Sequence, residues 1–231
     1  PRQPRSSSSS PPGGGLSMSP IFGYVLLIIA IIGLVILIFY LFFKAPVEQK
    51  SKKIKQDIGD IAPTIVQDMR YATENNFVKE KMYNCGKCFL RPQVAEALRE
   101  VHTILQVQGY GIKVYDCYRP RPIQQKLWDK VPNPNYVTPP AKGSMHNRGA
   151  AIDLTIVDSL GNELDMGTEF DYFGRKAHHT YTGHSDEINA NRTLLKSTME
   201  SIGFKSIRTE WWHYSYKKKS YAISDMIWDC E

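Results

Sequence analysis

Two short segments of the chain constrain its fold more than any other feature. The first runs from Ser144 to Asp153 and includes His146, and the second runs from Glu210 to His213. Together they supply two imidazoles and two carboxylates. Two His and one Asp form a ligand set that suits Zn²⁺ with one coordination position open for water, and the remaining Glu can act as a general base on that water. The sequence therefore predicts a fold that brings these distant segments together as a hydrolytic zinc site.

The segment at residues 150–157 (AAIDLTIV) has the β-branched composition of a buried strand. Strand alternation places Asp153 on the face opposite Ile152. A carboxylate in such an apolar run is costly unless it has a partner, and a metal ion is one such partner. Gly149 lets the chain turn between His146 and the strand, so that the two ligands converge. Two other interpretations stay open from the residues alone: Asp153 satisfied by backbone amides, and His146 as an ordinary loop histidine.

Bulky aromatic residues surround the second segment: Trp211, Trp212 and Tyr214. Such a shell excludes water from a site. Because burial disfavours the charged form of a carboxyl group, we expect the pKa of Glu210 to be raised toward the range useful for a general base.

Two further groups of residues allow more than one interpretation. His178 and His179 are rival metal ligands, of which one at most would face a metal, because adjacent residues of a strand point to opposite sides; a structural or supporting role is the favoured interpretation. Arg119 follows a predicted strand at residues 112–115. It either stabilises a developing oxyanion or pairs with Asp116.

The two zinc-type segments resemble those of the zinc D-alanyl-D-alanine dipeptidases of vancomycin-resistance type. This family belongs to a wider group with the zinc D-Ala-D-Ala carboxypeptidases and the hedgehog zinc fold. The similarity extends in unbroken order over about residues 58–229. It includes the segments at residues 69–77 (MRYATENNF), 116–120 (DCYRP), 165–171 (DMGTEFD) and 178–179 (HH).

The resemblance implies a set of metal ligands and catalytic groups. One Zn²⁺ per chain would be held by His146, Asp153 and His213. Glu210 would be the catalytic base, and Arg119 would stabilise the transition state.

The resemblance also implies the substrate and its contacts. Tyr71 and Asp171 would hold the substrate ammonium, and Ser144 would bind the substrate backbone. The implied function is hydrolysis of the D-Ala-D-Ala dipeptide to D-alanine in peptidoglycan metabolism. The alternatives are a D,D-carboxypeptidase or endopeptidase acting on cell-wall stem peptides, and a zinc-bound binding module without catalysis, which the presence of Glu210 and Arg119 disfavours.

The elements expected around the site are helices at residues 92–108, 123–130 and 189–202, with strands at residues 112–115 and around Glu210 and His213. Gly109 and Gly203 are expected to end two of the helices. His102 lies off the apolar face of its helix and is expected on the surface. Strands and helices that do not alternate regularly predict an α+β fold with a small antiparallel sheet and flanking helices, similar to the hedgehog and D-Ala-D-Ala peptidase folds.

The N-terminal part of the chain differs in composition from the rest. Residues 1–20 are rich in Ser, Pro and Gly and are expected to be disordered. Residues 21–43 form an uncharged run of 23 residues, long enough as a helix to span a hydrocarbon core of about 30 Å. Residues 44–57 are predicted to be a linker, and residues 58–231 the zinc dipeptidase domain.

The net charge of +6 bears on partners and on membrane side. The lysines form two clusters, one at Lys50, Lys52, Lys53 and Lys55 and one at Lys217, Lys218 and Lys219. The first cluster flanks the predicted membrane helix and the second has the composition of a solvated turn, so that a nucleic-acid partner is not expected. The Lys residues on the C-terminal flank of the helix favour a cytoplasmic catalytic domain. An enzyme of cell-wall peptides would instead face the periplasm, and this alternative stays open.

Cys85 and Cys88 form a C-x-x-C pair, and the other cysteines are Cys117 and Cys230. Pro92 and the residues before it interrupt the helix that a thioredoxin-type redox site needs. Free thiols, or a Cys85–Cys88 disulfide in an exported domain, are therefore expected.

Overall fold

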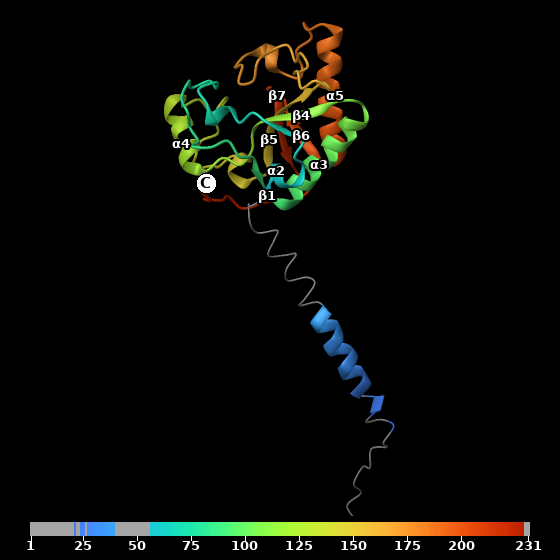
Figure 1. Ribbon diagram of the computed structural model, residues 1–231. Coiled ribbons are helices and arrows are strands. Elements are labelled where there is room, and N and C mark those ends of the chain that lie inside the picture. Colours follow the sequence, from blue (N-terminus) through green and yellow to red (C-terminus); the bar gives the residue numbers. More distant parts are fainter. Residues whose placement is uncertain (1–20, 22–23, 26, 40–55, 229–231) are drawn as a thin grey trace, which may run out of the picture. The chain divides into compact units, whose positions relative to one another are not determined.

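The computed structural model describes residues 21, 24–25, 27–39 and 56–228 (Figure 1). The chain divides into an N-terminal unit, residues 1–48, and a C-terminal unit, residues 49–231.

The predicted membrane span at residues 21–43 is described only in part. Residues 27–39 are helical with exposed side chains, whereas residues 22–23, 26 and 40–43 lie outside the described residues. No helix within the described ranges is long and apolar enough to cross a membrane. The membrane helix is therefore not supported by the structure and stays a prediction. The segments predicted at residues 1–20 and 44–57 fall almost entirely outside the described ranges.

The C-terminal unit is built on a five-stranded sheet with the order β2-β4-β5-β7-β6. Its strands are β2 (Val66–Gln67), β4 (Gly111–Asp116), β5 (Ala151–Val157), β6 (Phe204–Ile207) and β7 (Glu210–Tyr216). The pairs β4–β5, β5–β7 and β6–β7 are antiparallel, as predicted.

The predicted antiparallel sheet has one parallel edge, because β2 pairs with β4 in parallel. A parallel pair needs a crossover connection of a dozen or more residues, and the long segment from β2 through helix α3 (Pro92–Val107) supplies it. A separate two-stranded sheet joins β1 (Gln56–Asp57) to β3 (Phe89–Leu90). Strand β1 begins two residues inside the predicted linker.

The helices of this unit are α2 (Ile58–Ile61), α3, α4 (Arg121–Lys130) and α5 (Asp186–Ile202), with short 3₁₀ turns η1 (Arg70–Ala72), η2 (His146–Arg148) and η3 (Arg175–Ala177). Helix α5 begins three residues before the predicted start, because the Ser185 hydroxyl accepts a hydrogen bond from the Ile188 amide and caps the helix. Gly203 ends it in a left-handed conformation with φ of 108°, which a glycine adopts without steric cost.

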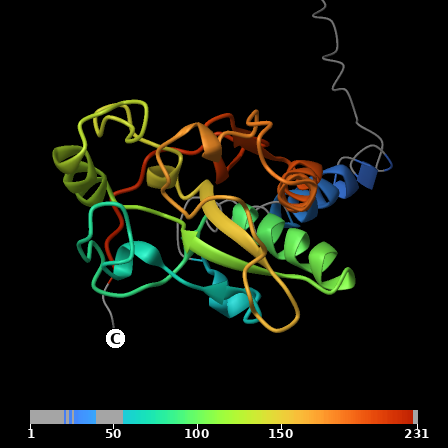
Figure 2. The same cartoon turned by 90° about the horizontal axis from the view of Figure 1, so that it is seen from above.

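Helices α3 and α5 pack against each other and against the sheet, and Figure 2 shows them on one side of the strands with α4 and the long loops on the other. Alternation along β5 turns Ile152 and Leu154 to one face and Asp153 to the other, and all three are buried. The prediction that His102 lies on the surface is wrong. Its side chain is buried, and its Nε2 atom lies 2.8 Å from the hydroxyl of Thr64, a residue between α2 and β2 of the same unit.

The expected Cys85–Cys88 disulfide is wrong, since Cys88 pairs with Cys117. Cys88 precedes β3 and Cys117 follows β4, and the Tyr118 amide donates to the Phe89 carbonyl 3.0 Å away. The fold thus brings together two segments separated by 29 residues. Cys85 is disulfide-bonded as well, so that the expected free thiols are not found among the described cysteines.

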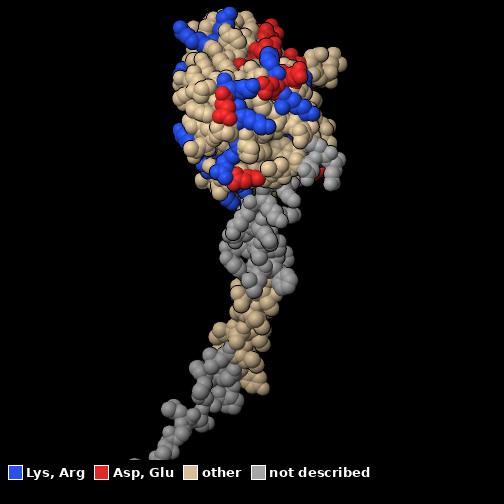
Figure 3. Space-filling view, turned by 90° about the vertical axis from the view of Figure 1, so that its left-hand side faces the viewer, with Lys and Arg blue, Asp and Glu red and all other residues tan. Residues whose placement is uncertain are grey.

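Lys and Arg side chains are interspersed with Asp and Glu on the face of the C-terminal unit seen in Figure 3. Surface ion pairs of the unit include Arg121 with Asp225 at 2.5 Å and Lys130 with Glu80. Among its described residues, this face carries no continuous basic surface of the kind that attracts a nucleic-acid backbone.

Candidate active site

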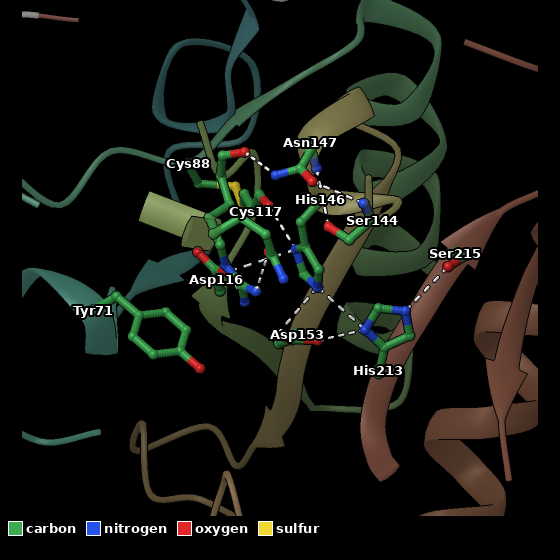
Figure 4. Close-up of polar contacts among 12 residues, drawn as sticks. Tyr71, Cys88, Asp116, Cys117, Ser144, His146, Asn147, Asp153, His213 and Ser215 are labelled. Atoms are coloured by element: carbon green, nitrogen blue, oxygen red, sulfur yellow. Dashed lines mark hydrogen bonds and ion pairs between the residues drawn. A yellow bond between two sulfur atoms is a disulfide. The ribbon is translucent and has the colours of Figure 1, made fainter. Parts of the chain in front are cut away.

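Three predicted metal ligands converge at the middle of the sheet (Figure 4). His146 begins the η2 turn, Asp153 lies on β5, and His213 lies opposite Asp153 on the antiparallel strand β7. Gly149 ends the η2 turn with φ of 63° and so redirects the chain into β5. Their facing atoms are close: His146 Nε2 is 3.3 Å from Asp153 Oδ2 and 3.2 Å from His213 Nδ1, which is 2.9 Å from Asp153 Oδ1.

Each imidazole is oriented by a hydrogen bond through its other nitrogen. His146 Nδ1 lies 2.6 Å from the Cys117 carbonyl oxygen, and this contact assigns the ring proton to Nδ1, because a carbonyl can only accept. His213 Nε2 lies 3.1 Å from the Ser215 hydroxyl. The Cys117 carbonyl therefore leaves His146 Nε2 as the nitrogen that faces Asp153, and the Ser215 contact holds the His213 ring with its Nδ1 toward Asp153, an arrangement typical of metal-binding histidines.

The donor set fits a zinc ion. Two imidazole nitrogens and a buried carboxylate face one another here, and Zn²⁺ binds such a set once the two nitrogens are deprotonated. Burial raises the pKa of Asp153, but the adjacent His146 and His213 outweigh this effect and hold the pKa well below its ordinary value. The carboxylate is therefore ionised. Ligands at about 2.0–2.2 Å from a tetrahedral ion are about 3.3–3.6 Å from one another, slightly longer than the separations of 2.9–3.3 Å found here.

Glu210 lies beside the metal ligands at the start of β7 and lines the same cavity. Its neighbours Trp211 and Trp212 are almost fully buried, as the aromatic sequence predicts. Burial raises the pKa of Glu210 to about 7, against the opposing charge of His213. A carboxylate with this pKa accepts and returns a proton near neutral pH.

Arg119 makes the pairing with Asp116 that is one of its two predicted roles, and its role toward an oxyanion stays a prediction. Its Nε and Nη2 atoms donate to Asp116 Oδ2 at 3.0 and 2.6 Å, and its Nη1 atom donates to Gln124 Oε1 at 3.0 Å. The guanidinium also lies over the Tyr71 ring, 4.9 Å from its centroid, and lines the cavity. Asp116 therefore fixes the guanidinium, which still faces the space next to the metal ligands.

Tyr71 and Asp171 form a pair at one end of the cavity. The Tyr71 hydroxyl donates to Asp171 Oδ2 at 3.0 Å. Asp171 has φ of 60°, a left-handed conformation that is uncommon for residues other than glycine and that recurs at ligand sites. Burial, together with the charge of Asp153, raises the pKa of Asp171 to about 8. The carboxyl group is thus poised to gain from a positively charged ligand.

Ser144 lies at the cavity wall in the loop before η2. Its amide donates to Asn147 Oδ1 at 2.8 Å, and the Asn147 side chain in turn donates to the Arg119 carbonyl at 2.7 Å. Asn147 therefore links the loop that carries Ser144 to the loop that carries Arg119.

All eight residues predicted for the site line one cavity of about 260 Å³. Ligand pockets of proteins commonly measure about 300–1,000 Å³, so this one suits a small ligand. His178 and His179 are not among its lining residues, and His178 Nδ1 instead lies 3.3 Å from Arg208 Nη1.

Several lining residues escaped the sequence prediction: Gln124, Tyr136, Phe173, Ser215 and Lys217. Ser215 and Lys217 had a usable signal, since alternation from His213 along the last strand places them on the same side. Gln124 and the stacked pair Tyr136–Phe173, whose ring centroids are 4.5 Å apart, had none, because they reach the site from separate loops and helix α4.

Comparison with known proteins identifies the family of the chain. The D-ala-D-ala dipeptidase family model matches residues 51–229. The D-alanyl-D-alanine dipeptidase of Escherichia coli is 37% identical over 158 residues, which cover 68% of this chain and 82% of the relative. The enzyme of the same name from Enterococcus faecalis is 32% identical over 175 residues, covering 67% and 87%.

One solved structure, VanYB in complex with D-Alanine-D-Alanine, is 18% identical, with a TM-score of 0.37 and coverage of 56% of this chain and 72% of that chain. A similarity this low supports no conclusion about the site.

Proposed function

The chain belongs to the D-ala-D-ala dipeptidase family of zinc metallopeptidases, and we propose that it hydrolyses free D-Ala-D-Ala to two molecules of D-alanine in peptidoglycan metabolism. The observation that carries the proposal is the convergence of His146, Asp153 and His213 beside Glu210 in one small cavity.

The proposed metal site holds one Zn²⁺ per chain through His146 Nε2, an Asp153 carboxylate oxygen and His213 Nδ1. When bound, Zn²⁺ lowers the pKa of water toward about 7 and polarises a carbonyl. The hydrogen bonds from His146 to Cys117 and from His213 to Ser215 keep the two rings aimed at this position.

In the proposed reaction, Glu210 removes a proton from the attacking water and delivers it to the nitrogen of the leaving D-alanine. A base of pKa about 7 suits both transfers at neutral pH. Arg119 opposes the negative charge that develops on the former carbonyl oxygen. Its contacts with Asp116 and Gln124 are made before substrate arrives, so that little reorganisation is needed during the reaction.

The Tyr71–Asp171 pair is the proposed binding site for the substrate ammonium, and Ser144 the proposed contact of its backbone. An ammonium next to Asp171 favours the ionised carboxylate and so replaces the cost of its burial with an ion pair. This arrangement favours a free dipeptide over the stem peptides of a carboxypeptidase or endopeptidase, because a stem peptide has an amide where the dipeptide has its charge.

We also propose that residues 21–43 anchor the protein in a membrane and that the catalytic unit faces an oxidising compartment. The anchor rests on the uncharged run of this segment. The orientation rests on the Cys88–Cys117 disulfide, since disulfides persist in oxidising compartments, although the Lys cluster after the segment favours the opposite side.

Labelling of intact cells with a thiol reagent that does not cross membranes, with and without a reductant that likewise stays outside, tests the orientation. Labelling that requires this reductant supports it, and labelling that requires cell lysis refutes it.

The proposed activity is tested with the purified full-length chain. Zinc content is measured per chain, and turnover of D-Ala-D-Ala is measured before and after the metal is removed and restored. One zinc per chain and activity that follows the metal are expected. Absence of stoichiometric zinc, or zinc retained after His146→Ala with His213→Ala, would refute the metal site.

A further inference from the structure

The cavity described above has an acidic end but no assigned partner for a carboxylate. Asp171 lies at one end with Tyr71. The guanidinium of Arg119 is largely engaged by Asp116 and Gln124. A free dipeptide carries an ammonium and a carboxylate, and burying the carboxylate without a partner would be costly. A site that selects such a ligand therefore needs a cation at the other end.

Lys217 is placed to supply that cation. It lines the cavity with an exposed side chain, and among the described residues no ion pair or hydrogen bond engages its ammonium. Its amide donates to the Gly203 carbonyl at 3.3 Å, which continues the pairing of β6 and β7 and holds the backbone in place. The side chain is thus anchored at its base and free at its tip.

The direction of β7 places Lys217 at the end opposite Asp171. Figure 4 shows Tyr71 and Ser215 on opposite sides of the three metal ligands. Lys217 directly follows the last residue of β7. Continued alternation places it on the side of Ser215, about 6.5–7 Å further along the chain. The order across the cavity is therefore the acidic pair, the metal ligands, Ser215 and then Lys217.

We propose that Lys217 binds the free carboxylate of the dipeptide and is a specificity-determining residue of this enzyme. This inference rests on the proposed dipeptidase function and adds a second charge requirement to it. In this proposal Asp171 binds the ammonium of the substrate and Lys217 binds its carboxylate, and the scissile bond lies between these two contacts. Lysine suits this task because its long, flexible stem delivers a point charge without a fixed geometry.

The test compares the zinc-loaded full-length wild type with Lys217→Met on D-Ala-D-Ala and on D-Ala-D-alaninamide, which lacks the negative charge. An exposed ion pair contributes up to ~1 kcal/mol, which is about fivefold. The wild type is expected to prefer the acid by about fivefold in kcat/KM. Lys217→Met is expected to lose about fivefold on the acid, mainly through KM, and to keep its rate on the amide.

Two matched variants separate this effect from a general loss of basic charge. Lys219→Met removes a nearby lysine that lies over the Tyr221 ring and is expected to leave both rates unchanged. Lys217→Arg is expected to keep the preference for the acid. Equal losses on acid and amide in Lys217→Met, or no loss on either, would overturn the assignment.

A binding measurement keeps this inference distinguishable from the proposed function. Calorimetry on Glu210→Ala, with and without Lys217→Met, gives the affinity for both ligands without turnover. If Lys217→Met weakens binding of the acid and leaves binding of the amide unchanged, the result supports the role of Lys217. If the wild type cleaved neither substrate, the proposed function would fail, and the calorimetric comparison would still decide for or against Lys217.

Discussion

The Nδ1 atom of His146 lies 2.6 Å from the backbone carbonyl oxygen of Cys117, so that a disulfide-bonded residue directly after β4 orients a proposed zinc ligand. Groups that orient metal-binding histidines typically contribute about 10–100-fold to metal affinity or activity. We expect Cys88→Ser with Cys117→Ser to weaken Zn²⁺ binding about tenfold, measured by competition with a chelator of known affinity.

The control for this prediction is Cys85→Ser, which removes a disulfide-bonded cysteine that is not among the residues lining the cavity. Its zinc affinity is expected to match that of the wild type. Circular dichroism shows whether the double variant is folded. Wild-type zinc affinity in a folded double variant would contradict the prediction.

Glu210→Ala is expected to keep the metal and to lose most turnover. The three metal ligands do not include Glu210, whereas a general base contributes about 10²–10⁴-fold to rate. Zinc content and kcat are measured on the same preparation. A variant that keeps its zinc and turns over at a near-normal rate would rule out the assigned base.

The pH dependence of kcat/KM is expected to show an acid limb assigned to Glu210. The base acts only when ionised, and burial raises its pKa to about 7, so activity falls as pH drops below that pKa. Because the charge of bound Zn²⁺ favours the carboxylate, the limb should lie at or below about pH 7, with a tenfold loss per pH unit below it. A profile that stays flat from about pH 7 down to about pH 5 would contradict this role.

Blocking the substrate amine is expected to slow cleavage at least about tenfold. N-acetyl-D-Ala-D-Ala has no ammonium, and leaving a buried carboxyl group such as Asp171 without its charged partner costs about 1–3 kcal/mol. Relative kcat/KM values on the free and acetylated dipeptides test this expectation.

The matched variant for this prediction is Asp171→Asn, because asparagine tolerates the φ of 60° at this position while it removes the charge. Its preference for the free amine should shrink toward unity. Equal rates of the wild type on both substrates would move the assignment to a carboxypeptidase.

The sequence was sufficient to place the chemical groups that lie in contiguous motifs. His146 and Asp153 are separated by one turn at Gly149, and alternation along β5 already assigns Asp153 to the face away from Ile152. The α+β class and the helices α3, α4 and α5 follow from local periodicity and from Pro and Gly at their ends. All eight predicted site residues line one cavity.

Features set by long-range contacts were beyond local patterns. The pairing of Cys88 with Cys117 depends on how β3 approaches the end of β4, and the parallel edge strand β2 depends on the crossover that contains α3. His102 follows the helical period of an exposed residue but is covered by Thr64 from a distant segment. The Tyr136–Phe173 pair joins two loops whose approach no spacing encodes.

The direct pairing of Asp153 with His213 across β5 and β7 ties the chemistry to the alignment of the two strands. A slip of one residue between them would turn one of these side chains to the opposite face and leave the other without its counterpart. A misaligned sheet would therefore have no metal site at all, rather than a weakened one. Stoichiometric zinc in a purified chain would therefore indicate that β5 and β7 are paired in this register.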